Sequence, residues 1–307
     1  MKSERPLLSA RRVKFYTRSF SLELYEQAKH LFEGAGYPCV RLTDQTADGY
    51  FFTMLADTDC DVAINVDEDA YIEDLVAVLD LAEFVLQQGY ANAGCPDCAP
   101  GCPRGGNPIV TNPFFNIFDL QQIRTKWKGR REGEREVRRF RYDDVKKQLR
   151  EKFEYDESLI VRPHFDSIYD EPYYNFFFWL AYHFRTLYLP NVKHSDGLST
   201  VLYSVDGRCL CKHSWMSRFY HQRSDQTSRI DALIDEVCES RGMKRLQFST
   251  AQILHFRLDH LLRFAIRVPQ RITNWPRKWK KWYDRYKRKT TIAIIPFISI
   301  NIFIFLK

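Results

Sequence analysis

The sequence lacks the glycine-rich phosphate loops of the common nucleotide-binding folds. Its thirteen glycines form neither G-x-G-x-x-G nor G-x-x-x-x-G-K-[ST], which argues against a Rossmann dehydrogenase and a P-loop NTPase. The N-terminus also lacks the glycine-rich loop with Arg or Lys that is usual in nucleotidyltransferases. No internal repeat of about 20–50 residues is visible, so a repeat architecture is not expected.

The N-terminal residues lack the apolar run of a secretory leader. Without a leader, the eight cysteines are expected to be reduced thiols in the cytosol. Hydrophobic residues make up 45% of the chain, so a packed core is expected and disorder is not. The length fits one large α/β domain with an appendage, or two small domains.

The net charge of +7 is concentrated near the C-terminus. Nine Lys or Arg and one Asp lie between Arg271 and Lys289, interleaved with three Trp and two Tyr. Basic residues near anionic lipid contribute about 1 kcal/mol each, and Trp and Tyr favour the headgroup region. A nucleic-acid surface would also be basic and aromatic, but an apolar C-terminus would not normally follow it. We therefore expect an anionic membrane surface as partner and no nucleic acid.

The apolar run that follows, Thr291–Leu306, is short for a membrane span. A span needs about 20 apolar residues, and Pro296 and Asn301 interrupt this one. A peripheral, monotopic or re-entrant anchor is therefore expected rather than a clean span.

Strands and helices are expected to alternate over the first hundred residues. Apolar periodicity predicts strands at 12–18, 37–43 and 61–66, and helices at 21–36, 44–57 and 75–89. This order implies a parallel sheet with right-handed crossovers. Later segments are predicted as a loop at 95–108, solvated helix at 121–156, helix at 173–188, a hairpin at 198–213 around Asp206-Gly207, and helix at 227–268.

Three carboxylates, Asp67, Glu68 and Asp69, directly follow the strand expected at 61–66. Such a run repels itself unless a cation lies between the groups, and hard divalent cations take oxygen ligands. In open α/β sheets, ligands bind outside the carboxyl ends of the strands. The sequence therefore predicts a site for a diphosphate bridged by Mg²⁺ or Mn²⁺.

The acidic residues also have a purely structural interpretation. Asp69, Glu73 and Asp74 precede the helix predicted at 75–89, and acidic side chains at a helix N-terminus interact favourably with its dipole. The sequence leaves this alternative open.

A strand, Asp-x-Asp and a long helix together resemble the signature of GT-A fold glycosyltransferases, which use nucleotide-sugar donors. The resemblance covers about residues 37–120, where Asn65–Ile72 and Thr111–Phe118 resemble family 2-like bacterial enzymes that build capsular and other surface polysaccharides. It implies Asp69 as the primary Mn²⁺ or Mg²⁺ ligand, with Asp67 holding the metal or the donor.

The resemblance also implies a catalytic carboxylate at the start of an acceptor-side helix. Asp170 and Glu171, with Asp166 nearby, match the family's acidic pair in place and type. An acceptor hydroxyl loses a proton as it attacks the sugar, so an inverting transferase needs such a base. Asp170 is slightly preferred over Glu171. The alternative is that the pair, followed by Pro172, caps the helix.

Further donor contacts are expected from single residues outside these clusters. His213 and Arg218 resemble the C-terminal His and the basic residues that contact metal or diphosphate in several GT-A enzymes, although a lone His is more often structural. The first-strand segment Tyr16, Thr17 and Arg18, with Asp44 after the second strand, occupies positions where such enzymes hold base and ribose. Tyr16 suits the core equally well.

The cysteines of the loop predicted at 95–108 allow a zinc site only if the fold brings distant thiols together. The cysteines concerned are Cys95, Cys98, Cys102, Cys209 and Cys211. Free thiols are the preferred interpretation. Because the corresponding loop covers the sugar in similar enzymes, the resemblance implies that Asp97 and Arg104 touch donor or acceptor.

The sequence as a whole predicts three parts. These are a GT-A-like, mostly parallel α/β domain at 1–222, a helical appendage at 223–270 and a membrane-binding tail at 271–307. The expected function is transfer of a sugar from a nucleoside diphosphate-sugar to a lipid-linked saccharide acceptor at the cytoplasmic face of the bacterial inner membrane. The alternative is a catalytically silent adaptor at the membrane surface, whose acidic residues cap helices.

Overall fold

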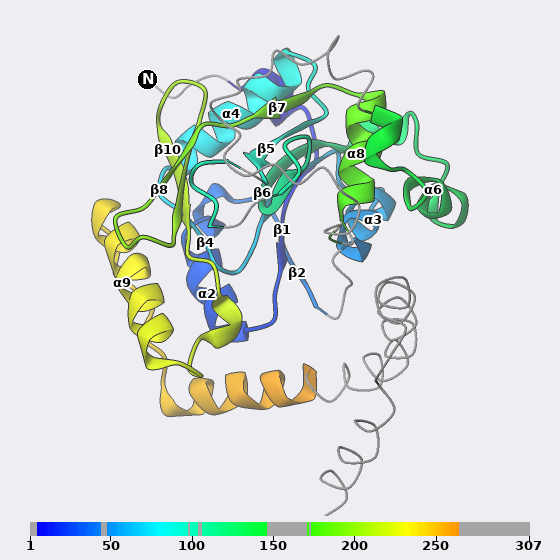
Figure 1. Cartoon of the computed structure of the whole chain (residues 1–307). Helices are drawn as coiled ribbons and strands as arrows, with labels where there is room; N and C mark the ends of the chain where they lie inside the picture. Colours follow the sequence, from blue (N-terminus) through cyan, green and yellow to red (C-terminus); the bar gives the residue numbers. More distant parts are fainter. Residues whose placement is uncertain are drawn as a thin grey trace, which may run out of the picture. The chain divides into compact units, whose positions relative to one another are not determined.

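A mostly parallel sheet forms the centre of the fold (Figure 1). The computed structural model describes residues 5–43, 48–97, 99–103, 106–145, 171 and 173–263. Across the sheet, the strands are β2 (Cys39–Leu42), β1 (Val13–Arg18), β3 (Val62–Val66), β6 (Thr111–Asp119), β5 (Asn92–Pro96) and β7 (Thr186–Tyr188). Strand β6 runs antiparallel to both its neighbours, whereas the β2-β1-β3 and β5-β7 pairings are parallel.

A second, antiparallel sheet begins directly after the acidic triplet. Its strands, in order, are β4 (Ala70–Ile72), β10 (Cys209–His213), β9 (Thr200–Tyr203) and β8 (Asn191–Lys193). The β9–β10 hairpin turns at Asp206-Gly207, where Gly207 has a φ of 82°. The predicted hairpin is therefore confirmed.

The α-helices flank these sheets. They are α1 (Pro6–Ser9), α2 (Leu22–His30), α3 (Gly49–Ala56), α4 (Leu75–Gln87), α5 (Leu120–Arg124), α6 (Arg130–Val137), α8 (Tyr174–His183) and α9 (Ser224–Ser240), and a further helix covers 250–263. The Ser21 hydroxyl accepts a hydrogen bond from Leu24 N–H and so fixes the start of α2. The predicted alternation from β1 to α4 is confirmed, with the first residues of the helix expected at 44–57 lying outside the described part.

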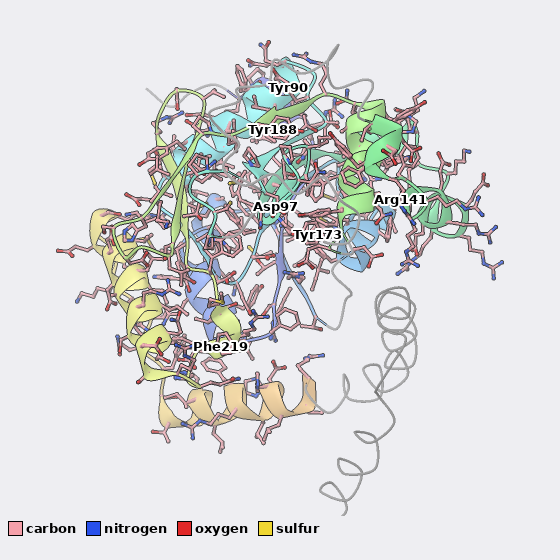
Figure 2. The ribbon with its side chains drawn as sticks, in the orientation of Figure 1. Tyr90, Asp97, Arg141, Tyr173, Tyr188 and Phe219 are labelled. Carbon is pink, nitrogen blue, oxygen red and sulfur yellow. The ribbon has the colours of Figure 1, made fainter. Side chains whose placement is uncertain are left out.

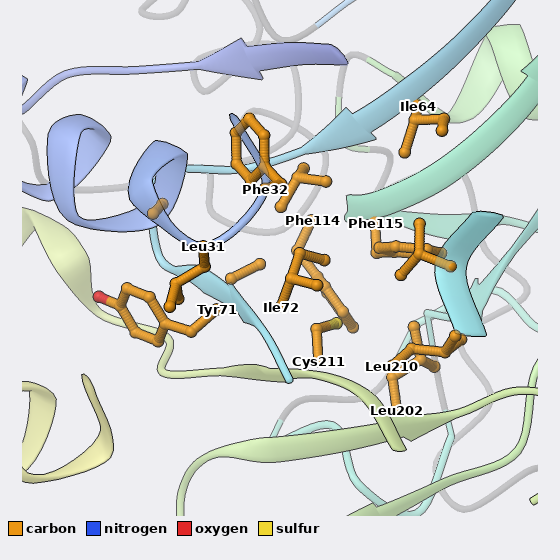
Figure 3. Close-up of a cluster of buried hydrophobic side chains, with 14 of the residues drawn as sticks. Leu31, Phe32, Ile64, Tyr71, Ile72, Phe114, Phe115, Leu202, Leu210 and Cys211 are labelled. Carbon is orange, nitrogen blue, oxygen red and sulfur yellow. The ribbon is translucent and has the colours of Figure 1, made fainter. Parts of the chain in front are cut away.

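Side chains of β3 alternate between two hydrophobic clusters. Val62, Ile64 and Val66 enter one cluster and Ala63 enters the other, as the period of two in a strand requires. Figure 3 shows part of the first cluster, which contains Ile64 and Phe115 from the central sheet and Ile72, Leu210 and Cys211 from the second sheet. The central sheet is thus buried on both faces, and its side chains hold the end of β3 in place.

Several predicted elements are wrong in extent. The helix predicted at 173–188 ends at His183, because 186–188 pair with β5 as strand β7. The loop predicted at 95–108 begins later, since β5 continues to Pro96. The helix predicted at 121–156 is divided into α5 and α6 within its described part, and Gly129, with a φ of 83°, precedes α6. The helix predicted at 227–268 is divided as well, because α9 ends at Ser240 and the next helix begins at residue 250. For β5 and β7, pairing between distant segments overrides the local pattern.

Helix α9 belongs to the main unit of the fold. Its buried residues Ile230, Leu233, Ile234 and Val237 join the same cluster as β3, and the first compact unit extends to His260. The boundary predicted at 222/223 therefore does not separate α9 from the sheet. The tail predicted at 271–307 lies outside the described residues. Among the helices that the structure describes, none has the length and apolar character needed to cross a membrane.

An ion pair between the exposed Arg12 and the buried Asp61 connects the start of β1 to the start of β3. Asp61 accepts hydrogen bonds from the backbone N–H of Arg12 (3.0 Å) and from its guanidinium (2.7 and 2.9 Å). These hydrogen bonds hold the pKa of Asp61 well below its usual range, although burial opposes them. The ionised form of Asp61 is therefore more stable in the folded state than in the unfolded chain.

Asp61→Asn is expected to cost about 2 kcal/mol at pH 7, the range for a hydrogen bond to a charged group. Because the folded pKa is depressed, this stabilisation is fully present above the unfolded pKa of about 3.9. It declines as pH falls below that value and is lost completely only below the folded pKa. Urea unfolding of wild type and variant between pH 7 and pH 3 measures this loss. Asp59→Asn, at an exposed position, should change little. A stability difference that is as large at pH 3 as at pH 7 would contradict this account.

Candidate functional site

A pocket of about 210 Å³ lies at the carboxyl ends of β1 and β3. Six of its lining residues are acidic or basic: Arg18, Asp67, Glu68, Asp69, Glu171 and His213. Arg18 is the last residue of β1, and Asp67 follows the last residue of β3. The structure thus brings together four residues that the sequence singled out, namely Asp67, Asp69, Glu171 and His213.

Asp67 is a buried carboxylate, and only one of its two oxygens has a hydrogen-bond partner. Its Oδ2 accepts from an Arg18 guanidinium nitrogen at 3.2 Å, and its Oδ1 is buried with no hydrogen-bond partner. Burial, reinforced by the charge of Asp69, raises the pKa of Asp67 to about 6 despite Arg18. An unsatisfied buried oxygen is costly, so this side chain is suited to binding a cation.

Glu68 holds the loop between β1 and α2. The backbone N–H groups of Phe20 and Ser21 both donate to its Oε2 at 2.7 Å. Burial and the neighbouring charge of Asp69 nevertheless raise the pKa of Glu68 to about 8. The middle acid of the triplet therefore shapes the pocket wall and is less suited to binding a cation.

Asp69 is paired with His213 through the second sheet. In the β4–β10 register, His213 lies opposite Ala70, and its Nε2 is 3.3 Å from Asp69 Oδ1. The imidazole stacks on Phe114 at 4.2 Å between ring centroids, and its Nδ1 is buried without a partner. Burial alone would raise the pKa of Asp69, but the charge and hydrogen bond of His213 outweigh it and lower the pKa. Asp69 is therefore held as an anion.

The structural interpretation of the acidic run applies to its later members only. Asp74 caps α4, accepting from Ala77 N–H at 2.9 Å, and Glu73 pairs with Lys212 at 2.6 Å. Strand β4 lies between Asp69 and that helix. Helix capping therefore does not explain why Asp67 and Asp69 line the pocket.

The two aspartates fit a divalent cation that is shared with a ligand. Within the described ranges, no group of three or more His, Cys, Asp or Glu side chains is arranged to hold a metal by itself. Mg²⁺ is often bound by only one or two carboxylates, together with phosphate oxygens and water. Asp67 and Asp69 supply that number, and the unpartnered Oδ1 of Asp67 is a suitable ligand.

Glu171 lies on the pocket wall just before α8. Its carbonyl accepts from Tyr174 N–H at 3.0 Å, while α8 has no side-chain cap at its first residue and no acidic side chain in its first turn. The N-cap position of α8 is therefore Tyr173 and not Glu171. Asp166 and Asp170 lie outside the described residues.

Three other residues expected to contact the donor, Tyr16, Thr17 and Arg218, are described and do not line this pocket. Tyr16 is buried, and its hydroxyl donates to Asp57 at 2.5 Å, which fits its core interpretation. Thr17 is also buried. Arg218 is exposed and lies over the Phe219 ring. Asp44 is outside the described part of the chain.

Arg18 and Trp215 both line the pocket. Sequence reasoning named Arg18 only as the end of the first-strand segment Tyr16–Arg18, and it missed Trp215. The signal for Arg18 was its place at the carboxyl end of a strand parallel to β3, where ligands bind. Trp215 had no such signal. Its backbone has a φ of 57°, followed by Met216 at 61°, and its indole N–H donates to Thr200 at 2.8 Å. Such left-handed conformations cost about 1–3 kcal/mol each and cluster at functional sites.

Asp97 is a buried positioning group. It accepts hydrogen bonds from the Tyr174 hydroxyl (2.5 Å) and from the Asn112 amide (2.6 Å), and the Tyr173 hydroxyl lies at 3.5 Å. Figure 2 labels Asp97 and Tyr173. Since Asn112 and Tyr173 line the pocket, Asp97 holds two wall residues and does not itself face the pocket. Arg104 lies outside the described residues.

The cysteines that the structure describes are free thiols. Cys95 and Cys102 lie side by side, with 3.9 Å between their sulfur atoms. Cys211 is buried in the hydrophobic cluster of β3. Cys98, another member of the predicted zinc-binding set, lies outside the described residues.

Comparison with models of protein families and with curated proteins finds no match for this chain. The chemistry of the pocket therefore carries the functional inference.

Proposed function

We propose that the protein is a metal-dependent glycosyltransferase that moves a sugar from a nucleoside diphosphate-sugar to a lipid-linked saccharide. The observation that carries the proposal is the pair Asp67 and Asp69 in a pocket that Glu171 also lines. A mostly parallel sheet, with the antiparallel strand β6 beside β3, supports the GT-A-like assignment. A cation site and a separate carboxylate are the two requirements of inverting sugar transfer.

On the donor side, Asp67 and Asp69 would hold Mn²⁺ or Mg²⁺ together with the diphosphate. When bound, the ion supplies Lewis-acid stabilisation of the departing nucleoside diphosphate. Arg18 keeps its charge, because Asp67 and Asp69 raise its pKa although burial opposes them. The pocket volume of about 210 Å³ is below the range of about 300–1,000 Å³ for complete ligand pockets. It suits the diphosphate and its cation.

On the acceptor side, Glu171 would take the proton of the attacking hydroxyl. The acceptor oxygen forms a bond to the anomeric carbon while the bond from that carbon to the diphosphate oxygen breaks. The proton passes to the carboxylate, and the electron pair leaves with the diphosphate. Asp170 is the alternative base, from the same segment. His213 would hold Asp69 in place through its Nε2, or contact the metal or the diphosphate.

The C-terminal sequence supports a lipid-linked acceptor at the cytoplasmic face of a bacterial inner membrane. The basic and aromatic residues between Arg271 and Lys289 suit an anionic surface. Confinement of enzyme and acceptor to one surface raises their effective concentration.

A donor-hydrolysis screen tests the proposal. UDP-, GDP- and dTDP-sugars are incubated with the full chain and Mn²⁺ or Mg²⁺, and nucleoside diphosphate release is measured. At least one donor should be hydrolysed, and removal of the ion by a chelator should lower the rate at least ~1,000-fold, since Lewis-acid stabilisation is worth several kcal/mol. If no donor is hydrolysed and neither ion increases retention of any nucleoside diphosphate, the transferase proposal is wrong. That result would favour the alternative, a catalytically silent adaptor at the membrane surface.

A further inference from the structure

The helix that begins at residue 250 carries two exposed leucines within the first compact unit. Leu254 and Leu258 are 58% and 51% exposed. Their spacing of i and i+4 places them on one face of the helix, one turn apart. We call these two residues the leucine face. Neighbouring apolar side chains that are exposed on one helix face suit an apolar partner surface.

The opposite side of the same helix is fixed to the first compact unit. Phe256 is buried and meets Phe248 edge to face at 4.8 Å, and Asp259 pairs with Arg41 at 2.9 Å. The helix begins with a capping box, in which Ser249 and Gln252 exchange hydrogen bonds. The helix is therefore formed and oriented by contacts that leave the leucine face uncovered by described residues.

The leucine face belongs to a helix that is linked to the pocket end of the sheet. Arg41, which holds Asp259, also donates to Ser19 Oγ at 3.0 Å. The next two residues along the chain, Phe20 and Ser21, donate their backbone N–H groups to Glu68 of the acidic triplet. This helix, drawn in orange in Figure 1, is thus joined to the pocket wall by a short series of polar contacts.

We propose that the leucine face docks on an anionic lipid bilayer and sets the pocket beside its surface. The chain that follows this helix contains nine Lys or Arg interleaved with Trp and Tyr between Arg271 and Lys289, and that composition complements an anionic lipid surface. An amphipathic helix followed by a basic segment is the usual composition of an interfacial anchor. The inference goes beyond the proposed function, because docking requires neither donor nor metal.

Vesicle binding of the full chain tests the proposal in the absence of nucleotide and metal. Sedimentation with phosphatidylcholine vesicles, with and without phosphatidylglycerol, compares wild type with Leu254→Glu/Leu258→Glu. The double variant should lower the partition coefficient for the anionic vesicles at least ~tenfold, because two leucines no longer leave water and two charges oppose the lipid. The matched control is Val76→Glu/Val205→Glu, at positions 53% and 47% exposed on other elements, which should bind as wild type does.

Hydrogen exchange separates this face from any other lipid contact in the chain. Anionic vesicles should slow exchange of the peptide covering 250–263 in wild type and not in the double leucine variant. Unchanged vesicle binding and unchanged exchange in that variant would overturn the proposal. So would a leucine variant that turns a dimer into a monomer while keeping its vesicle affinity, because the face would then be a contact between two copies. A failed donor screen with leucine-dependent vesicle binding would refute the transferase and leave the docking intact.

Discussion

Asp69→Asn is expected to lower metal-dependent donor hydrolysis at least ~1,000-fold, because it removes the carboxylate best suited to the cation. Loss of several kcal/mol of charge stabilisation corresponds to a factor of this size. Asp69 is held as an anion by His213, and an amide in its place supplies no charge to a divalent ion. Initial rates with the best donor, measured over a range of Mn²⁺ concentrations, should reveal both the lower rate and a weaker dependence on the ion.

Asp74→Asn is the matched control for this variant. It removes one carboxylate from the same acidic run, but Asp74 caps α4 and does not line the pocket. Asn is also a good cap residue, so the rate and the melting temperature should both stay close to wild type. If Asp69→Asn keeps its activity within tenfold of wild type, Asp69 is not the primary metal ligand.

Glu171→Gln is expected to lower kcat by about 10²–10⁴, the range for loss of a general base. The amide keeps the size of the side chain but cannot accept the proton of the acceptor hydroxyl. Retention of the nucleoside diphosphate with Mn²⁺ should be unchanged, because Asp67 and Asp69 remain. Transfer to a lipid-linked saccharide and equilibrium binding of the diphosphate give the two measurements.

Asp170→Asn decides between the two candidate bases. If Asp170→Asn loses its activity and Glu171→Gln turns over normally, Asp170 is the base that accepts the proton of the acceptor hydroxyl. Glu132→Gln, on the exposed surface of α6, serves as the charge control and should behave as wild type. Normal turnover in both Asp170→Asn and Glu171→Gln would show that neither carboxylate is the base.

The first half of the central sheet could be predicted from local pattern alone. The strands β1, β2 and β3 and the helices α2 and α4 follow their apolar periodicity, and Ser21 and Asp74 cap the two helices. Short-range rules succeed here because each strand is followed by a helix that packs back on the sheet.

The later half depends on partners that lie far away in the sequence. Residues 186–188 read as the end of an aromatic helix, but pairing with β5 draws them into an edge strand. The run at 111–119 has no period that reveals its direction. Its antiparallel place between β3 and β5 follows from pairing with both neighbours. Strand pairing is decided by tertiary contacts, which a local pattern does not contain.

The candidate site shows the same division. The acidic triplet at the end of β3 is visible in sequence, because a buried strand that ends in carboxylates places them at the sheet edge where ligands bind. The tertiary structure decides which contacts each of the three acidic side chains makes. Glu68 is bonded to backbone amides, Asp67 meets Arg18, and the β4–β10 register places His213 on Asp69.

The sequence by itself determined the alternating α/β start of the chain and the position of the acidic residues, since both follow from periodicity over a few residues. Only the tertiary structure decided which of those acids share a pocket, which cap a helix, and which cation faces them. The physical reason is that desolvation and charge pairing depend on distances between groups brought together by strand pairing. Arg18 and Asp67 are 49 positions apart in sequence and 3.2 Å apart in space.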